Sequence, residues 1–146
     1  KDTRLRQAIE KKYREGVFFS GTSAGTAIMS KVMITGEGDF TVVDGSKVET
    51  VEGLGLLPNI ILDQHFLKRS RYNRLIGLVL KYQSQLGAGI DEDTALYIAN
   101  NRNAEVLGAS SVLIFDAAKM NAPMTVTFLK RGDRFDLVKR KKINGR

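Results

Sequence analysis

Three short apolar runs, each followed within a few residues by polar side chains, constrain the fold of this chain more than any other feature. They occupy residues 17–19, 60–62 and 88–90. A continuous apolar run of this length is typical of a strand buried on both faces, as in a parallel sheet. Helical patterns separate the runs. We therefore predict an α/β fold, a mostly parallel sheet with helices packed on both of its faces.

The helices of this prediction come from apolar residues at helical spacing. Leu5, Ile9 and Tyr13 mark one stripe of an N-terminal helix, and residues 26–33 can continue as a second helix. A third helix is predicted for residues 70–82. Its inner face should carry four apolar side chains: Leu75, Ile76, Val79 and Leu80.

The remaining strands are predicted from β-rich stretches between turn residues. A hairpin is expected around residues 40–43 and 48–51, because the turn Asp44-Gly45-Ser46 lies between them. The last third of the chain reads as further strands joined by Asn- and Gly-rich turns. These strands are expected at residues 95–99, 105–107, 111–115 and 124–130.

Length and composition limit the classes of protein to consider. The 146 residues suffice for one domain. The chain has no cysteine and one histidine, which excludes a disulfide scaffold, a thiol nucleophile and a multi-histidine metal site within it. The net charge is +7, but most of the excess lies in residues 1–14 and 134–146 instead of the folded middle. We therefore expect no nucleic-acid partner.

The chain carries no sign of a membrane or secretory segment. No stretch reaches the ~18 consecutive apolar residues of a membrane span, and the N-terminus has no apolar signal region. The first residues lie inside a helical pattern and do not begin with Met. We expect a cytoplasmic protein without a membrane partner, and a chain that is part of a longer one.

A glycine-flanked serine, Gly21-x-Ser23-x-Gly25, lies between a predicted strand and a predicted helix. This is the form of a nucleophile elbow, in which the serine occupies a turn so sharp that its flanking residues need almost no side chain. Amide N–H groups at the start of the helix can then stabilise an oxygen that becomes negative during acyl transfer. The alternative is an ordinary glycine-rich turn, which the strand and helix on either side disfavour.

His65 is the only base that could activate this serine by imidazole chemistry, and its alternative is a structural, hydrogen-bonded histidine. A carboxylate should orient the imidazole. Asp63 is two residues away and points to the opposite face if the strand continues. Asp91, Glu92 and Asp93 end the next apolar run, and the pattern alone does not choose among them. The order serine, histidine, acid differs from that of the α/β-hydrolases.

Three arginines follow the histidine closely. Arg71 and Arg74 lie on the same face of the predicted helix, and Arg69 precedes them. Guanidinium groups bind carboxylates through two-point contacts, so these residues favour an acidic substrate. The alternative is a solvated helix face.

Together these segments resemble the cyanophycinases, serine exopeptidases related to the aspartyl dipeptidase peptidase E. The motifs that carry the resemblance are GTSAG (21–25), DQHF (63–66) followed by the three arginines, and GIDEDTAL (89–96), within residues 16–116. The family's fold resembles that of class I glutamine amidotransferases, which is flavodoxin-like. Its members are about twice this length. The resemblance implies that residues 1–146 are the C-terminal portion of a single α/β serine peptidase domain.

The resemblance also implies a reaction. It is hydrolysis of cyanophycin, a poly-aspartate with arginine on each β-carboxyl, to β-Asp-Arg dipeptides through an acyl-enzyme at Ser23. His65 would be the base, Glu92 the acid, and the Ala24 N–H half of the oxyanion hole. The family's glycine-rich oxyanion segment and a substrate-binding glutamine precede its serine, and neither is found here. The isolated chain is therefore expected to lack part of its site.

The remaining implications concern ligands and partners. No cofactor or metal is expected, and the family suggests a homodimer. The alternatives are an α-aspartyl dipeptidase of the same family and a homologue that binds peptides without cleaving them. Five residues would hold the peptide or polymer substrate: Asp63, Gln64, Arg69, Arg71 and Arg74.

Overall fold

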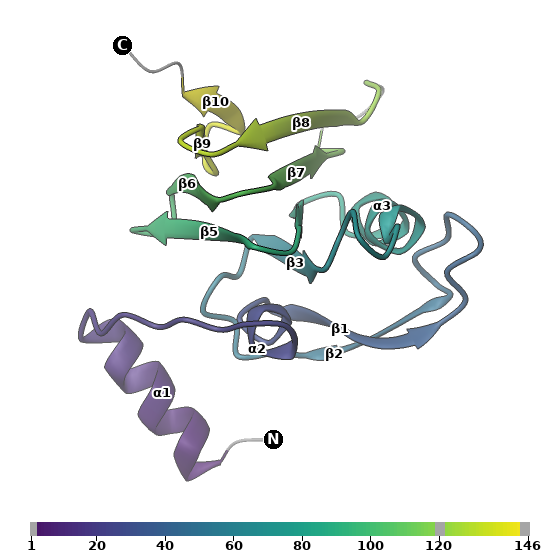
Figure 1. Ribbon diagram of the computed structural model, residues 1–146. Helices are drawn as coiled ribbons and strands as arrows, with labels where there is room; N and C mark the ends of the chain where they lie inside the picture. Colours follow the sequence, from purple (N-terminus) through teal and green to yellow (C-terminus); the bar gives the residue numbers. More distant parts are fainter. Residues whose placement is uncertain (1–2, 119–121, 144–146) are drawn as a thin grey trace.

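The computed structural model describes residues 3–118 and 122–143, which form an α/β arrangement of short helices and small sheets (Figure 1). The helices are α1 (Arg4–Arg14), α2 (Ala24–Ala27) and α3 (Tyr72–Lys81). The strands are β1 (Val32–Gly38), β2 (Val48–Glu52), β3 (Ile60–Gln64), β4 (Leu86–Ile90), β5 (Thr94–Ala99), β6 (Asn103–Gly108), β7 (Ser111–Asp116), β8 (Thr125–Lys130), β9 (Arg134–Asp136) and β10 (Lys141–Ile143).

In the described residues the strands form one hairpin and two four-stranded sheets. The hairpin pairs β1 with β2, and the sheets have the orders β3-β4-β7-β8 and β10-β9-β6-β5. Among these strand pairs only β3–β4 runs parallel. The expected mostly parallel sheet is therefore not confirmed. The reason lies in the connections, because the short turns after β5 and β9 permit only antiparallel neighbours, whereas α3 provides the long crossover between β3 and β4.

The β3–α3–β4 unit matches its prediction closely. Both strands are almost entirely buried, and α3 packs on them through Leu75 and Val79. Glycine at position 87 permits this contact, because a Cβ there would lie 2.5 Å from the Val79 side chain. One detail of the prediction is wrong. Leu80 is 44% exposed, and Leu78 is the buried residue instead.

The sheet β3-β4-β7-β8 separates two hydrophobic cores. On one face it packs against the second sheet, and on the other against α3 and the β1–β2 hairpin. Successive residues of β3 alternate between the cores, as expected for a strand buried on both faces. The first core includes Ile60, Leu62, Ala88, Ala104, Val106, Val112, Leu129 and Phe135. The second includes Ile34, Val48, Ile61, Phe66, Leu75, Leu78, Leu113 and Phe115.

The predicted strand at residues 17–19 is wrong in this structure. Residues 17–22 form neither helix nor strand, and the Phe18 side chain is 72% exposed. A strand requires a partner for its backbone groups, and no described strand is paired with this segment. Phe18 lies instead beside the ring of Tyr97 of β5, with centroids 6.3 Å apart.

The helix predicted for residues 26–33 is also mostly wrong. Helix α2 ends at Ala27, and Val32 and Met33 belong to β1, where they pair with β2. The hairpin therefore uses residues 48–51 as predicted, but not residues 40–43, which lie in the connecting loop. The Asp39 carboxylate closes that loop by accepting hydrogen bonds from the backbone and hydroxyl of Thr41.

Helix α1 projects from the body of the molecule (Figure 1) and has no buried residue. Arg6 pairs with Glu52 of β2 at 3.0 Å, and the Tyr13 hydroxyl bonds the side chain of Asn101 after β5. In the part of the chain that the structure describes, no helix combines the length and apolarity needed to cross a membrane.

Candidate active site

Ser23 occupies a strained turn immediately before α2. Its φ is 53° and its ψ is −121°, a conformation that costs an L-residue energy. The turn is tight at Gly21, where a Cβ would lie 2.2 Å from the Gly25 carbonyl oxygen. At Gly25 a Cβ would meet nothing within 4 Å. The sequence predicted that both glycines are required, but the structure requires only the first for steric reasons.

His65 follows the last residue of β3 and reaches Ser23 with one ring nitrogen. The distance from Ser23 Oγ to His65 Nε2 is 3.3 Å. The other nitrogen, Nδ1, lies 3.0 Å from Glu92 Oε1. The structure thus brings the three predicted side chains into one chain of contacts.

The parallel register of β3 and β4 explains why His65 and Glu92 meet. Gln64 is paired with Ile90, so the residues that follow both strands emerge at the same edge of the sheet. The structure also separates the three acidic candidates. The Asp91 carboxylate faces the backbone of Leu67 and Lys68, Asp93 is exposed, and Glu92 alone of the three contacts the imidazole.

This arrangement fits acid–base chemistry on a hydroxyl. A carboxylate at Nδ1 favours the tautomer with its proton on that nitrogen, which leaves Nε2 free to accept the Ser23 proton. A contact of 3.3 Å is long for a hydrogen bond, and such contacts commonly shorten when substrate binds.

Four of the five predicted substrate residues bind one another in two pairs. Asp63 and Arg74 are buried and form a two-point ion pair, in which Nε lies 2.7 Å from Oδ2 and Nη2 bonds Oδ1. Arg71 donates to the backbone and side-chain oxygens of Gln64, both at 2.8 Å. Burial and the nearby Arg74 and Arg69 lower the pKa of the Arg71 guanidinium, and Asp63 opposes this shift.

The three arginines line a cavity of about 250 Å³. Arg69 is exposed, and the Arg74 guanidinium lies over the Phe40 ring, 5.3 Å from its centroid. Gln64 differs from them, because it lines the larger groove that contains Ser23 and His65. Asp63 lines neither space. The substrate roles of all five residues stay predictions.

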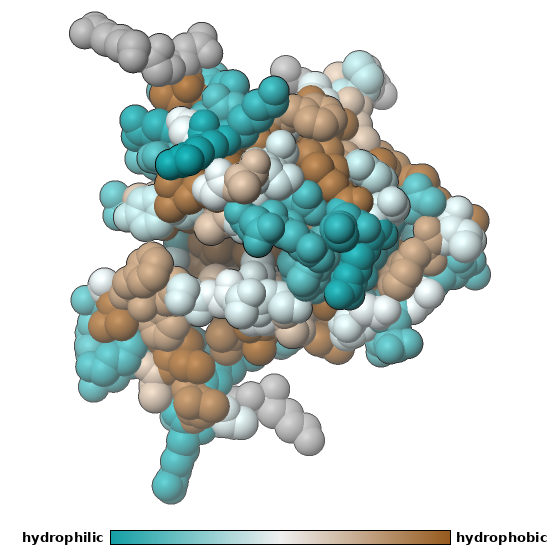
Figure 2. All heavy atoms as spheres, in the orientation of Figure 1, coloured by the Kyte–Doolittle hydropathy of each residue, from teal (hydrophilic) through white to brown (hydrophobic). Residues whose placement is uncertain are grey.

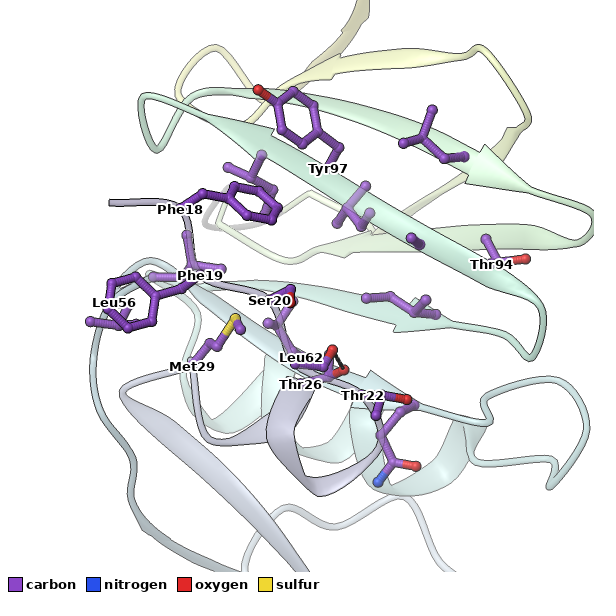
Figure 3. Close-up of a pocket in the computed structure, with 18 of the residues that line it drawn as sticks. Phe18, Phe19, Ser20, Thr22, Thr26, Met29, Leu56, Leu62, Thr94 and Tyr97 are labelled. Atoms are coloured by element: carbon purple, nitrogen blue, oxygen red, sulfur yellow. Dashed lines mark hydrogen bonds between the residues drawn. The ribbon is translucent and has the colours of Figure 1, made fainter. Parts of the chain in front are cut away.

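The larger groove measures about 1160 Å³ and extends from Ser23 along β5 to Tyr13 and Phe18. Figure 2 shows a hollow with a hydrophobic interior between α1 and the strands above it. In Figure 3, Phe18 and Tyr97 lie together at one end of the groove and Thr94 lies on the strand across from Thr22. Sequence reasoning missed the contribution of β5. A β-rich stretch before an Asn-rich turn predicted the strand, but nothing indicated which neighbour it would face.

Within residues 3–118 and 122–143, no cluster of three or more His, Asp or Glu side chains is arranged to hold a metal ion.

The family model and the curated relatives that match this chain agree on one family. The family model described as Peptidase family S51 matches residues 1–106. A cyanophycinase from Trichormus variabilis is 39% identical over 155 residues, covering 95% of this chain and 52% of the relative. A cyanophycinase from Geminocystis herdmanii is 37% identical over 121 residues, covering 82% of this chain and 44% of that relative.

A solved structure agrees at the level of the fold. The crystal structure of a peptidase from an acI-B1 Actinobacterium matches with a TM-score of 0.64 at 23% identity, covering 92% of this chain and 52% of that one. This chain spans about half the length of the curated relatives it matches. The family match covers the segments that supply Ser23, His65 and Glu92. The chain belongs to peptidase family S51.

Proposed function

We propose that this chain carries the reacting residues of a serine exopeptidase that hydrolyses cyanophycin to β-Asp-Arg dipeptides. The observation that carries the proposal is the chain of contacts from Ser23 Oγ to His65 Nε2 and from His65 Nδ1 to Glu92 Oε1. The name cyanophycinase, shared by relatives at 37–42% identity, supports the choice of substrate.

The proposed reaction has two halves. His65 Nε2 takes the proton of Ser23 as Oγ attacks the scissile carbonyl, and Glu92 stabilises the imidazolium through Nδ1–H. The imidazolium then protonates the leaving amine, which leaves an ester on Ser23. In the second half His65 activates water, and the water hydrolyses the ester. General-base catalysis of this kind contributes about 10²–10⁴-fold to the rate.

The turn around Ser23 serves this reaction as a nucleophile elbow. The strained backbone of Ser23 and the close approach of Gly21 to Gly25 support this role, because they hold the hydroxyl at the start of α2. The Ala24 N–H, first in that helix, would provide half of the oxyanion hole.

We also propose that the chain is the C-terminal portion of one α/β peptidase domain with an amidotransferase-like fold. The β3–α3–β4 unit supports this, because His65 and Glu92 follow the carboxyl ends of its two parallel strands. The same proposal includes a homodimer, which the mass of the protein in solution would test.

The decisive experiment measures β-Asp-Arg released from purified cyanophycin by mass spectrometry, using the protein at its natural full length. Ser23→Ala should abolish release. Ser46→Ala, in the exposed loop between β1 and β2, is the matched control and should retain it. Release that survives Ser23→Ala would exclude this nucleophile. Cleavage of α-linked aspartyl dipeptides, with cyanophycin left intact, would favour the aspartyl dipeptidase alternative.

A further inference from the structure

Asp91 lies next to Glu92 but takes no part in the contacts from Ser23 to Glu92. Both oxygens of its carboxylate nevertheless accept hydrogen bonds. Oδ1 accepts hydrogen bonds from the backbone N–H groups of Leu67 and Lys68, at 3.1 and 3.0 Å, and Oδ2 accepts one from the Ser110 hydroxyl at 2.8 Å. One carboxylate therefore joins three segments that are distant in the sequence.

The first of these segments is the turn that carries His65. The β3–β4 ladder ends at the pair Gln64 and Ile90, so the residues beyond it need other attachments. His65 has a φ of 51°, a left-handed conformation that the surrounding structure must maintain. One attachment is the Phe66 N–H, which donates to the Ile90 carbonyl at 3.2 Å. The two bonds to Asp91 fasten the next two amides of the same turn.

The other segments hold the turn that carries Glu92. The Thr94 hydroxyl donates to the Glu92 carbonyl at 3.1 Å and accepts the Ser110 N–H at 2.9 Å. Because the Ser110 hydroxyl binds Asp91, the same short network reaches both partners of the imidazole–carboxylate contact. Burial by itself raises the pKa of the Asp91 carboxyl, but the hydrogen bonds from Lys68, Ser110 and the neighbouring amides hold it below its ordinary value.

We infer that Asp91 is a positioning residue that sets the contact between His65 and Glu92 by joining their two turns. It neither gives nor takes a proton in the reaction. The geometric part of this inference stands without the proposed function. Its consequence for turnover rests on that function.

The geometric part can be tested without substrate by NMR of the histidine ring nitrogens in the protein at its natural full length, with the His65 signals identified by their loss in His65→Gln. Long-range proton–nitrogen spectra report which ring nitrogen carries the proton. The unsubstituted protein should show the Nδ1–H tautomer. Asp91→Ala should lose this preference for the Nδ1–H tautomer. Glu92→Gln should lose it too, because it removes the carboxylate that contacts Nδ1. Asp91→Asn should retain it, because the amide oxygen still accepts from Leu67 and Lys68 and the amide NH₂ can donate to Ser110.

The matched control is Asp93→Asn, an exposed neighbour at which asparagine tolerates the positive φ of 53°, and it should leave the tautomer unchanged. An unchanged tautomer in Asp91→Ala would overturn the inference. If that variant does not fold, Ser110→Ala decides the question, since it removes the Oδ2 bond alone and should weaken the Nδ1–H signal. An unaltered signal in a folded Ser110→Ala protein would then overturn it.

Turnover of cyanophycin by the full-length protein tests the consequence. Asp91→Ala should lower kcat about 10- to 100-fold, because a misplaced base loses part of its contribution to the rate. KM should change by no more than about twofold. Asp91→Asn should restore most of the rate. Failure of the unsubstituted protein to cleave cyanophycin would remove the proposed function but leave the tautomer result intact. Equal kcat for Asp91→Ala and the unsubstituted protein would overturn the positioning role.

Discussion

The turn at Ser23 can be tested by comparing two glycine substitutions four residues apart. An alanine Cβ at position 21 would lie 2.2 Å from the Gly25 carbonyl oxygen, 2.5 Å from its carbon and 3.0 Å from the Met29 methyl group. Backbone atoms cannot rotate out of the way, so the turn must open. Overpacking of this kind costs about 1–3 kcal/mol, and contact with backbone favours a value of about 2 kcal/mol or more.

The same substitution at position 25 should have the opposite effect. A Cβ there meets nothing within 4 Å, and the residue lies within α2. Alanine in place of helical glycine usually stabilises by about 0.5–1 kcal/mol, and a four-residue helix should give the lower part of this range. Gly25→Ala is therefore the matched control for Gly21→Ala.

Urea denaturation followed by far-ultraviolet circular dichroism measures both effects. With a slope of about 2 kcal/mol/M, Gly21→Ala should lower the midpoint by about 1 M, whereas Gly25→Ala should leave it unchanged or raise it slightly. Equal midpoints for the two variants, or a higher one for Gly21→Ala, would refute the steric account of the turn.

Three further predictions concern the buried carboxylates of Asp63 and Asp136 and the proposed catalytic acid, Glu92. Asp63→Ala should reduce the free energy of unfolding by about 3–5 kcal/mol, because it leaves the Arg74 guanidinium buried without its partner. Adding Arg74→Met should recover part of that loss in thermal denaturation, and a strictly additive double variant would contradict the pairing. The Lys139 N–H, and with it Arg102, lowers the pKa of the Asp136 carboxyl against the effect of burial. Its contribution to stability is therefore present above about pH 4 and lost as the pH falls further, so Asp136→Asn should flatten the decline of the melting temperature below about pH 4. Glu92→Gln should lower kcat on cyanophycin at least about 100-fold with little change in KM, and an unchanged kcat would remove Glu92 from the proposed mechanism.

The local pattern around the site predicted much of what the structure contains. The runs at 60–62 and 88–90 and the helix between them form a complete β–α–β unit, and such a unit sets its own register. The neighbourhood of His65 and Glu92 follows from that register. Period-two alternation could not separate Asp91, Glu92 and Asp93, because the strand ends before them and the backbone turns.

The sequence-based predictions that the structure contradicts share one physical cause. The run at 17–19 is apolar enough for a buried strand, but burial also requires a partner, and a sequence pattern does not reveal which segment will supply it. The order β10-β9-β6-β5 is similarly set by contacts between distant residues. In the same way, the pattern around Ser23 did not show that only Gly21 approaches other backbone atoms.

The three residues that we propose to react differ in how firmly the fold holds them. His65 and Glu92 follow strands whose amides lie in a paired, buried sheet, where hydrogen exchange is expected to require opening of the whole core. Ser23 follows residues 17–22, which have no ladder to a described strand, so their amides should exchange through small local openings. The contact between Ser23 and His65 should thus separate long before the molecule unfolds. We therefore expect the imidazole and its carboxylate to keep their positions while the serine moves relative to them.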